Sequence, residues 1–88
     1  MPARTEVRVT VRYFAAARAA AGAESETIDV PAGTTVDGLL ETLRRRDDGL
    51  AKVLARCSYL RDGIAVRDRG VSLDDAQTID VLPPFAGG

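Results

Sequence analysis

Very few side chains in this sequence are of a kind that catalyses reactions without help. The chain contains no histidine, which is the usual general base near neutral pH. Its single cysteine, Cys57, follows Leu50, Val53 and Leu54 at helical spacing, and this pattern favours a small buried hydrophobic residue over a reactive thiol. A lone cysteine also excludes an intramolecular disulfide and the usual zinc sites built from cysteine and histidine.

The acidic residues and the glycines do not form a recognisable catalytic pattern either. The pairs Asp47-Asp48 and Asp74-Asp75 fall in turn-like segments, where adjacent carboxylates typically serve as caps or exposed turn residues. Gly22, Gly33 and Gly38 lack the spacing of a phosphate-binding or dinucleotide-binding loop. We therefore expect that this chain is not an enzyme on its own and that it holds no tightly bound cofactor or metal.

The C-terminal segment, PPFAGG, is the most informative part of the sequence. Pro83 and Pro84 cannot donate to a sheet ladder, so a strand must end there and the chain continues in a stiff, extended form. Gly87 and Gly88 have no side chains and therefore fit a narrow channel. Extended residues span about 3.3 Å each, so roughly four to six of them reach about 13–20 Å, enough to enter a pocket of another protein. The alternative is a disordered end whose glycines have no function.

Alternating apolar residues predict the strands that must hold this tail. Residues 6–14 alternate between apolar side chains and Arg or Thr, and residues 25–30 and 78–82 show the same period. We expect the first and the last of these strands to pair in parallel at the centre of a sheet. The tail would then leave from the end of a central strand.

Two apolar residues fall on the polar face of these strands, each where its strand ends. They are Phe14 and Leu82, and a parallel pairing places them side by side. Together with Pro83, Pro84 and Phe85, they are expected to form an apolar docking patch near one edge of the sheet, beside the tail.

The segments between the strands predict the helices and a hairpin. Residues 15–21 favour a short helical turn that ends at Gly22. The main helix is expected to begin with Thr34 as its N-cap and Asp37 in the capping-box position. Its predicted core positions are Val36, Leu39, Leu40 and Leu43. A shorter helical segment covers residues 50–57, and Asp62-Gly63 is a hairpin signal. The fold class is therefore α+β, with one main helix packed on one face of the sheet.

Composition restricts the classes of partner. The chain has 88 residues, with 12 basic against 13 acidic, and this balance argues against nucleic acid and membrane surfaces as partners. The length fits one domain, which we place at residues 6–82, with a frayed N-terminus at 1–5 and an extended tail at 83–88. The lone cysteine fits a reducing compartment, and we find no targeting segment, so we expect a cytoplasmic protein.

Basic residues gather in the first quarter of the chain. Arg8 and Arg12 lie on the outer face of the first predicted strand, with Arg4 and Arg18 on either side. A solvated strand face explains this positive stripe, and a docking patch for an acidic partner is the functional alternative.

Two motifs resemble the small subunit of molybdopterin synthase, a family of ubiquitin-like sulfur carriers. They are VRYFAAARAAAG at residues 11–22 and DVLPPFAGG at residues 80–88, and the resemblance extends over residues 6–88. It implies a β-grasp fold with a mixed sheet of about five strands. It further implies that Gly88 is adenylated and converted to a thiocarboxylate, the group that gives sulfur to a cyclic pyranopterin precursor in molybdenum cofactor biosynthesis. The residues that the resemblance places against partners are Phe14, Arg18, Leu82, Pro83, Pro84, Phe85, Ala86 and Gly87.

The partners implied by the resemblance are two proteins. One is the large subunit of the synthase, in a heterotetramer, and the other is an E1-like adenylating and sulfur-transferring enzyme that uses ATP. The sequence departs from the family in two turns, at Arg61-Asp62-Gly63 and at Ala76-Gln77. Two alternatives therefore stay open: a sulfur carrier for thiamine or cysteine biosynthesis, and a ubiquitin-like modifier or interaction domain without sulfur chemistry.

Overall fold

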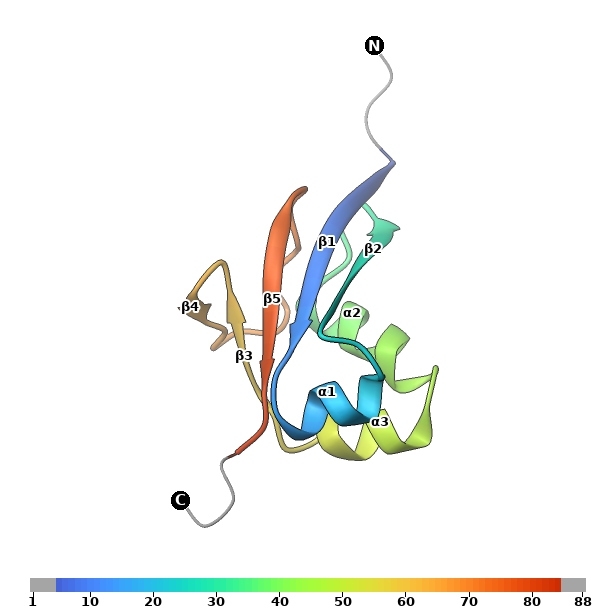
Figure 1. Cartoon of the computed structure of the whole chain (residues 1–88). Coiled ribbons are helices and arrows are strands. Elements are labelled where there is room, and N and C mark those ends of the chain that lie inside the picture. The colour runs from blue at the N-terminus through green and yellow to red at the C-terminus, as the bar shows by residue number, and fades with distance from the viewer. Residues whose placement is uncertain (1–4, 85–88) are drawn as a thin grey trace.

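A five-stranded mixed sheet forms the framework of the molecule, and helices cover one of its faces (Figure 1). The computed structural model describes residues 5–84, so residues 1–4 of the predicted frayed N-terminus and residues 85–88 of the predicted tail lie outside it. Along this range the elements are β1 (Glu6–Tyr13), α1 (Ala16–Ala21), β2 (Ser25–Pro31), α2 (Val36–Arg44), α3 (Asp48–Leu54), β3 (Ser58–Arg61), β4 (Ile64–Ala65) and β5 (Gln77–Leu82). No helix among these is both long enough and apolar enough to cross a lipid bilayer.

The first and last strands are the central pair of the sheet. β1 and β5 run in parallel, with Val9 beside Gln77 at one end of the ladder and Tyr13 beside Val81 at the other. β2 pairs with β1, and β3 pairs with β5 and with the short strand β4, which gives the order β2-β1-β5-β3-β4. The predicted parallel pairing and the α+β class are both confirmed.

One apolar core lies between this sheet and the helices. The inward residues of the central strands are fully or almost fully buried: Val9, Val11, Tyr13, Ile79 and Val81. The main helix, α2, contributes the opposite wall of the core at helical spacing, with Val36, Leu39, Leu40 and Leu43 all at 0% exposure. Full burial of such side chains stabilises the fold by about 1.5–3 kcal/mol each. The core positions predicted for the main helix are therefore confirmed.

The start of α2 differs by one residue from the prediction. Thr35, rather than Thr34, is the N-cap, and its hydroxyl accepts a hydrogen bond of 3.0 Å from the Gly38 backbone N–H. The Thr34 hydroxyl instead donates to the carbonyl oxygen of Pro31 at 2.6 Å, which closes the turn before the helix. Adjacent threonines can both cap a helix, and the turn decides which one is used.

We expect Thr35→Ala to lower the free energy of unfolding by about 1 kcal/mol, because it removes this cap. Urea denaturation followed by circular dichroism measures the change. Thr34→Ala is the matched variant, and its loss should be smaller because the N–H groups of α2 keep their partner. An equal or larger loss from Thr34→Ala would show that the cap was assigned to the wrong residue.

The second helical segment is shorter than the apolar spacing suggests. Asp47 caps α3 through a 2.9 Å hydrogen bond from the Leu50 N–H, so Asp48 and Gly49 belong to the first turn instead of breaking the chain between helices. Cys57 follows the end of α3 and is 6% exposed, and its thiol donates to the Val53 carbonyl oxygen at 3.2 Å. Burial raises the pKa of the Cys57 thiol, which agrees with the predicted structural role.

Two turns use backbone conformations that normally favour glycine. Asp62 and Gly63 both have positive φ, 48° and 83°, as a tight hairpin between β3 and β4 requires, so the predicted hairpin is confirmed. Ala76 has a φ of 65° just before β5, and its N–H donates to the Arg8 carbonyl oxygen at 2.8 Å. Ala76 therefore fills a left-handed position, at a cost of roughly 1–2 kcal/mol from its β-carbon.

Both tyrosines are buried, and this makes the fold sensitive to alkali. Tyr59 donates to the Leu54 carbonyl oxygen at 2.6 Å, and burial is the main cause that raises its pKa to about 12. Burial, followed by its hydrogen bond to Glu26, raises the pKa of Tyr13. As the pH rises, the tyrosines of the unfolded chain therefore ionise before those of the folded chain. Both residues make their full contribution to the free energy of unfolding only below about pH 10.

We expect the free energy of unfolding to fall as the pH rises from about 10 to about 12, because the tyrosines ionise in the unfolded state before they ionise in the fold. Urea denaturation across this range, with tyrosinate absorbance recorded in parallel, measures it. The free energy of unfolding of the Tyr59→Phe variant should fall less steeply with pH, because this variant has one fewer phenol to ionise. A constant free energy of unfolding over the same range would contradict this assignment.

Candidate functional site at the root of the tail

The parallel pairing brings the ends of β1 and β5 to the same end of the sheet. Tyr13 lies beside Val81, and the next residue, Phe14, donates its N–H to the Val81 carbonyl oxygen at 3.2 Å. Leu82 follows Val81 and pairs with Ser58 of β3. Phe14 and Leu82 therefore lie where the tail begins, as the register predicts, and their contact with a partner stays a prediction.

The apolar patch lies at the end of the central strands, as the register predicts, but it is less exposed than expected. Phe14, Leu82 and Pro83 are half-buried, and Pro84 is exposed. The Arg12 guanidinium lies over the Phe14 ring, 5.7 Å from its centroid, which covers part of the ring. Phe85, Ala86, Gly87 and Gly88 lie outside the described residues, so the roles predicted for them stay predictions.

The positive stripe predicted on the outer face of β1 is neutralised by acidic residues on the strands beside it. Arg12 donates from Nε and Nη2 to the two carboxylate oxygens of Asp80, at 2.6 and 2.8 Å, and Arg8 pairs with Asp29 at 2.9 Å. These hydrogen bonds raise the pKa of both guanidinium groups. Asp80 is only 5% exposed although its side chain is on the outer face, because Arg12 lies across it. The stripe is therefore not a free cationic surface.

Arg18, predicted to face a partner, lies on α1 and is exposed. Its nearest partner is the Glu24 carboxylate, at 3.1 Å, and both side chains are largely in solvent. Exposed pairs of this kind add little stability, so Arg18 is free to exchange partners. It does not line the groove beside the tail, which is formed by other residues.

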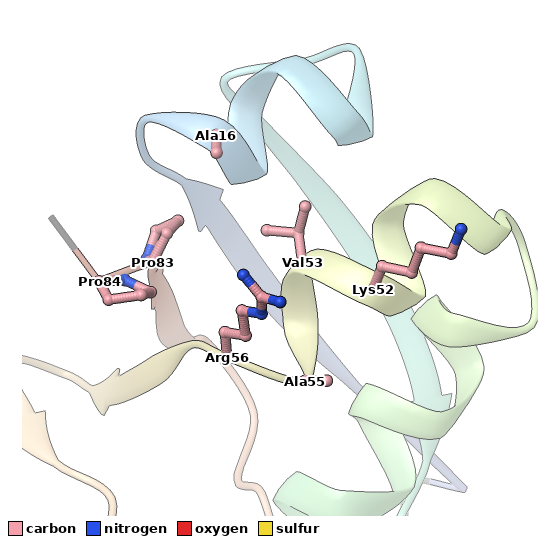
Figure 2. A pocket seen from close by; sticks show the side chains of 7 residues that line it. All are labelled: Ala16, Lys52, Val53, Ala55, Arg56, Pro83 and Pro84. Atoms are coloured by element: carbon pink, nitrogen blue, oxygen red, sulfur yellow. The ribbon is translucent and has the colours of Figure 1, made fainter. Parts of the chain in front are cut away.

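Pro83 and Pro84, which we call the tail root, also form one wall of a groove (Figure 2). The groove encloses about 590 Å³ between α1, α3 and the tail root. Its lining consists of Ala16, Lys52, Val53, Ala55, Arg56, Pro83 and Pro84. In Figure 2 the Arg56 side chain, just beyond the end of α3, points into the gap between α3 and the prolines, and Lys52 lies on α3 itself.

This groove was not predicted from the sequence. Lys52 lies on the exposed side of α3, and Arg56 lies two residues beyond the end of that helix, so the two cations are four positions apart along the chain. The sequence does not reveal that α3 packs against α1 beside the tail root. The chain turns from β1 into α1 at Ala15, which has a φ of 50°, a backbone conformation that few residues other than glycine adopt.

Between residues 5 and 84, no group of three or more metal-binding side chains comes together. The thiol of Cys57 is buried and its pKa is raised. What the site presents to another molecule is a half-buried aromatic ring, a leucine, two prolines and the cationic groove, all at the base of the tail.

A model of the ThiS family matches residues 11–88 of this chain, from within β1 through the C-terminal glycines. The chain belongs to the ThiS family. A curated relative, the molybdopterin synthase sulfur carrier subunit of Chlamydomonas reinhardtii, is 26% identical over 83 residues, which cover 93% of this chain and all of the relative. The fold of a Pyrococcus furiosus protein described as subunit 1 of molybdopterin converting factor superposes with a TM-score of 0.81 and 29% identity, covering 90% of this chain and 99% of that one.

Two more distant structures share the fold alone. One is the complex of subunits 1 and 2 of molybdopterin-converting factor from Helicobacter pylori, with a TM-score of 0.70, 23% identity, and 93% and 100% of the two chains covered. The other is SAMP1 of Haloferax volcanii, with a TM-score of 0.80, 24% identity, and 92% and 99% covered. The predicted β-grasp, ubiquitin-like fold is confirmed, and so is the resemblance on which it was based.

Proposed function

We propose that this chain is the sulfur carrier and small subunit of molybdopterin synthase. The observation that carries the proposal is the ThiS match, which includes the terminal Gly87-Gly88, together with the curated carrier subunit that aligns over 93% of the chain. In this function, Gly88 carries a thiocarboxylate whose sulfur is given to a cyclic pyranopterin precursor in molybdenum cofactor biosynthesis. The protein acts in the cytoplasm.

The chemistry begins with the Gly88 carboxylate, which is a poor electrophile. An E1-like activating enzyme binds ATP, one carboxylate oxygen attacks the α-phosphorus, and pyrophosphate leaves. The outer sulfur of a persulfide on the donor protein then attacks the carbonyl carbon, and AMP leaves, which gives an acyl disulfide. A thiol of the donor or activating enzyme attacks the donor's sulfur in this disulfide, so the donor is released as a disulfide and the transferred sulfur leaves as the thiocarboxylate. No side chain of this chain needs to take a proton, and no cofactor needs to stay bound to it.

The fold serves this chemistry by holding the tail in place. Central strand β5 leads directly into Pro83 and Pro84, which end the ladder and fix their own φ angles near −65°, so less backbone entropy is lost when a partner binds the tail. Phe14 and Leu82 lie beside this exit as apolar contacts for the receiving protein. Phe85, Ala86 and Gly87 complete the contact in the proposed complex, with Arg18 at its margin.

The proposed receiving protein is the large subunit of the synthase, in a heterotetramer of two small and two large subunits. The Helicobacter pylori structure supports this partner, because there a protein of the same fold is in complex with a second subunit. In the proposed complex, the large subunit supplies the catalytic side chains.

Intact-mass measurement tests the proposal. The purified chain is incubated with the activating enzyme, ATP and a sulfur donor, and we expect a mass gain equal to the replacement of one oxygen by sulfur. Reconstitution with the large subunit and the precursor should then produce molybdopterin. Sulfur loading without molybdopterin would favour thiamine or cysteine biosynthesis. Transfer of the chain to protein lysines without sulfur loading would favour a modifier, the function that the name of SAMP1 suggests for that protein.

A further inference from the structure

The groove at the tail root carries two cations that the fold does not neutralise. Six arginines of the described chain form ion pairs with nearby carboxylates: Arg8, Arg12, Arg18, Arg44, Arg45 and Arg46. Lys52 and Arg56 have no such pair within residues 5–84, and both are exposed. No carboxylate of residues 5–84 lines the groove, although the chain as a whole has a net charge of −1.

The groove is therefore cationic along α3 and apolar elsewhere. Ala16, Val53 and Pro83 provide the apolar surface, and the two cations come from α3 (Lys52) and from the turn that follows it (Arg56). An acidic side chain next to an apolar one complements both properties, since the carboxylate gains charge-assisted hydrogen bonds while the apolar side chain leaves water.

We propose that this groove docks an acidic segment, with an adjoining apolar side chain, of the large subunit that receives the tail. The inference rests on the function proposed above and extends its interface from the tail to the helices. Continuity supports it, because Pro83 and Pro84 are at once the first residues of the tail and one wall of the groove. A protein that binds the tail and contacts Pro83 and Pro84 must therefore lie next to Arg56.

Charge reversal tests the docking. We compare the wild-type chain with the double variant Lys52→Glu, Arg56→Glu and measure the dissociation constant for the large subunit by calorimetry at low and at physiological salt. The double variant should bind on the order of tenfold to a hundredfold more weakly, because it places like charges against the acidic segment. Its affinity should also lose the salt dependence of the wild type. A double variant with neutral Lys52→Gln and Arg56→Gln should show an intermediate loss.

The matched control is Arg67→Glu, which reverses an exposed charge after β4, beside a separate small pocket. This control should bind like the wild type, and circular dichroism should show that every variant keeps the fold. Wild-type affinity in the reversed double variant, or an equal loss in Arg67→Glu, would overturn the docking proposal. Thiocarboxylation of Gly88 is measured separately by mass, and its failure would count against the proposed function. A wild-type chain that does not bind the large subunit would overturn both the proposed function and the docking proposal.

Two other occupants of the groove have distinct signatures. If the chain's own tail filled it, a chain ending at Pro84 would shift the amide resonances of α3 in NMR spectra of the free protein. If a second copy filled it, sedimentation would show a dimer that the reversed double variant dissociates. Either result would overturn the proposal, which expects unchanged α3 resonances and a monomer.

Discussion

A chain that carries one additional residue after Gly88 is expected to lose sulfur transfer completely. The proposed chemistry requires the terminal carboxylate to belong to a residue without a side chain, because the carbonyl carbon must reach the nucleotide of the activating enzyme through a narrow channel. An added alanine moves the carboxylate one residue further and puts a methyl group beside it. Intact mass after incubation with the activating enzyme, ATP and a sulfur donor should show no sulfur, and reconstituted synthase should form no product.

An alanine added at the N-terminus is the control for this experiment. The parallel pairing of β1 and β5 places the start of β1 at the end of the sheet opposite to the tail root, so this addition should leave sulfur loading unchanged. Sulfur transfer by the C-terminally extended chain would refute the thiocarboxylate proposal. Loss of transfer in both variants would indicate that the assay responds to something other than the tail.

Leu39→Ala is expected to lower the free energy of unfolding by about 2–5 kcal/mol, the largest loss of stability that we predict. Leu39 is at 0% exposure on α2, where that helix packs on the sheet. The substitution removes buried apolar surface and leaves a cavity that a close-packed core fills only in part. Domains of this size are stable by roughly 5–15 kcal/mol, so the variant should keep only a fraction of that stability. Urea denaturation measures the change.

Thr42→Ala is the matched variant on the same helix. Thr42 is exposed, and its hydroxyl donates to the Gly38 carbonyl oxygen at 3.1 Å. Its replacement should change the free energy of unfolding by less than about 0.5 kcal/mol. A loss below about 1 kcal/mol for Leu39→Ala would mean that the core collapses around the missing side chain.

Features set by local pattern could be predicted from the sequence. Strict alternation in β1 is enough to tell its buried from its exposed face, and the spacing of leucines in α2 identifies the face that meets the sheet. The parallel pairing of β1 and β5 followed from the fact that these strands are the most apolar. The position of Phe14 beside the tail root then follows from register alone.

Features that depend on distant parts of the chain could not be predicted. Arg12 and Asp80 are 68 residues apart, so their ion pair exists only once the register of β1 against β5 is fixed. The groove needs α1 and α3 to pack side by side next to the tail root, and no local periodicity encodes that contact. The N-cap of α2 was missed by one residue, because Thr34 and Thr35 are equally good caps and the preceding turn decides between them.

The place of β5 in the sheet has a consequence for damaged copies of this protein. β5 is the middle strand, and it alone joins the β2-β1 half to the β3-β4 half. Proteolysis that removes β5 therefore leaves two pairs of strands that no backbone ladder joins, and it also removes the buried Ile79 and Val81 from the core. A copy that has lost β5 with its tail does not persist as a folded, inactive competitor for the partner proteins. The proposed sulfur delivery and the integrity of the sheet thus depend on the same strand.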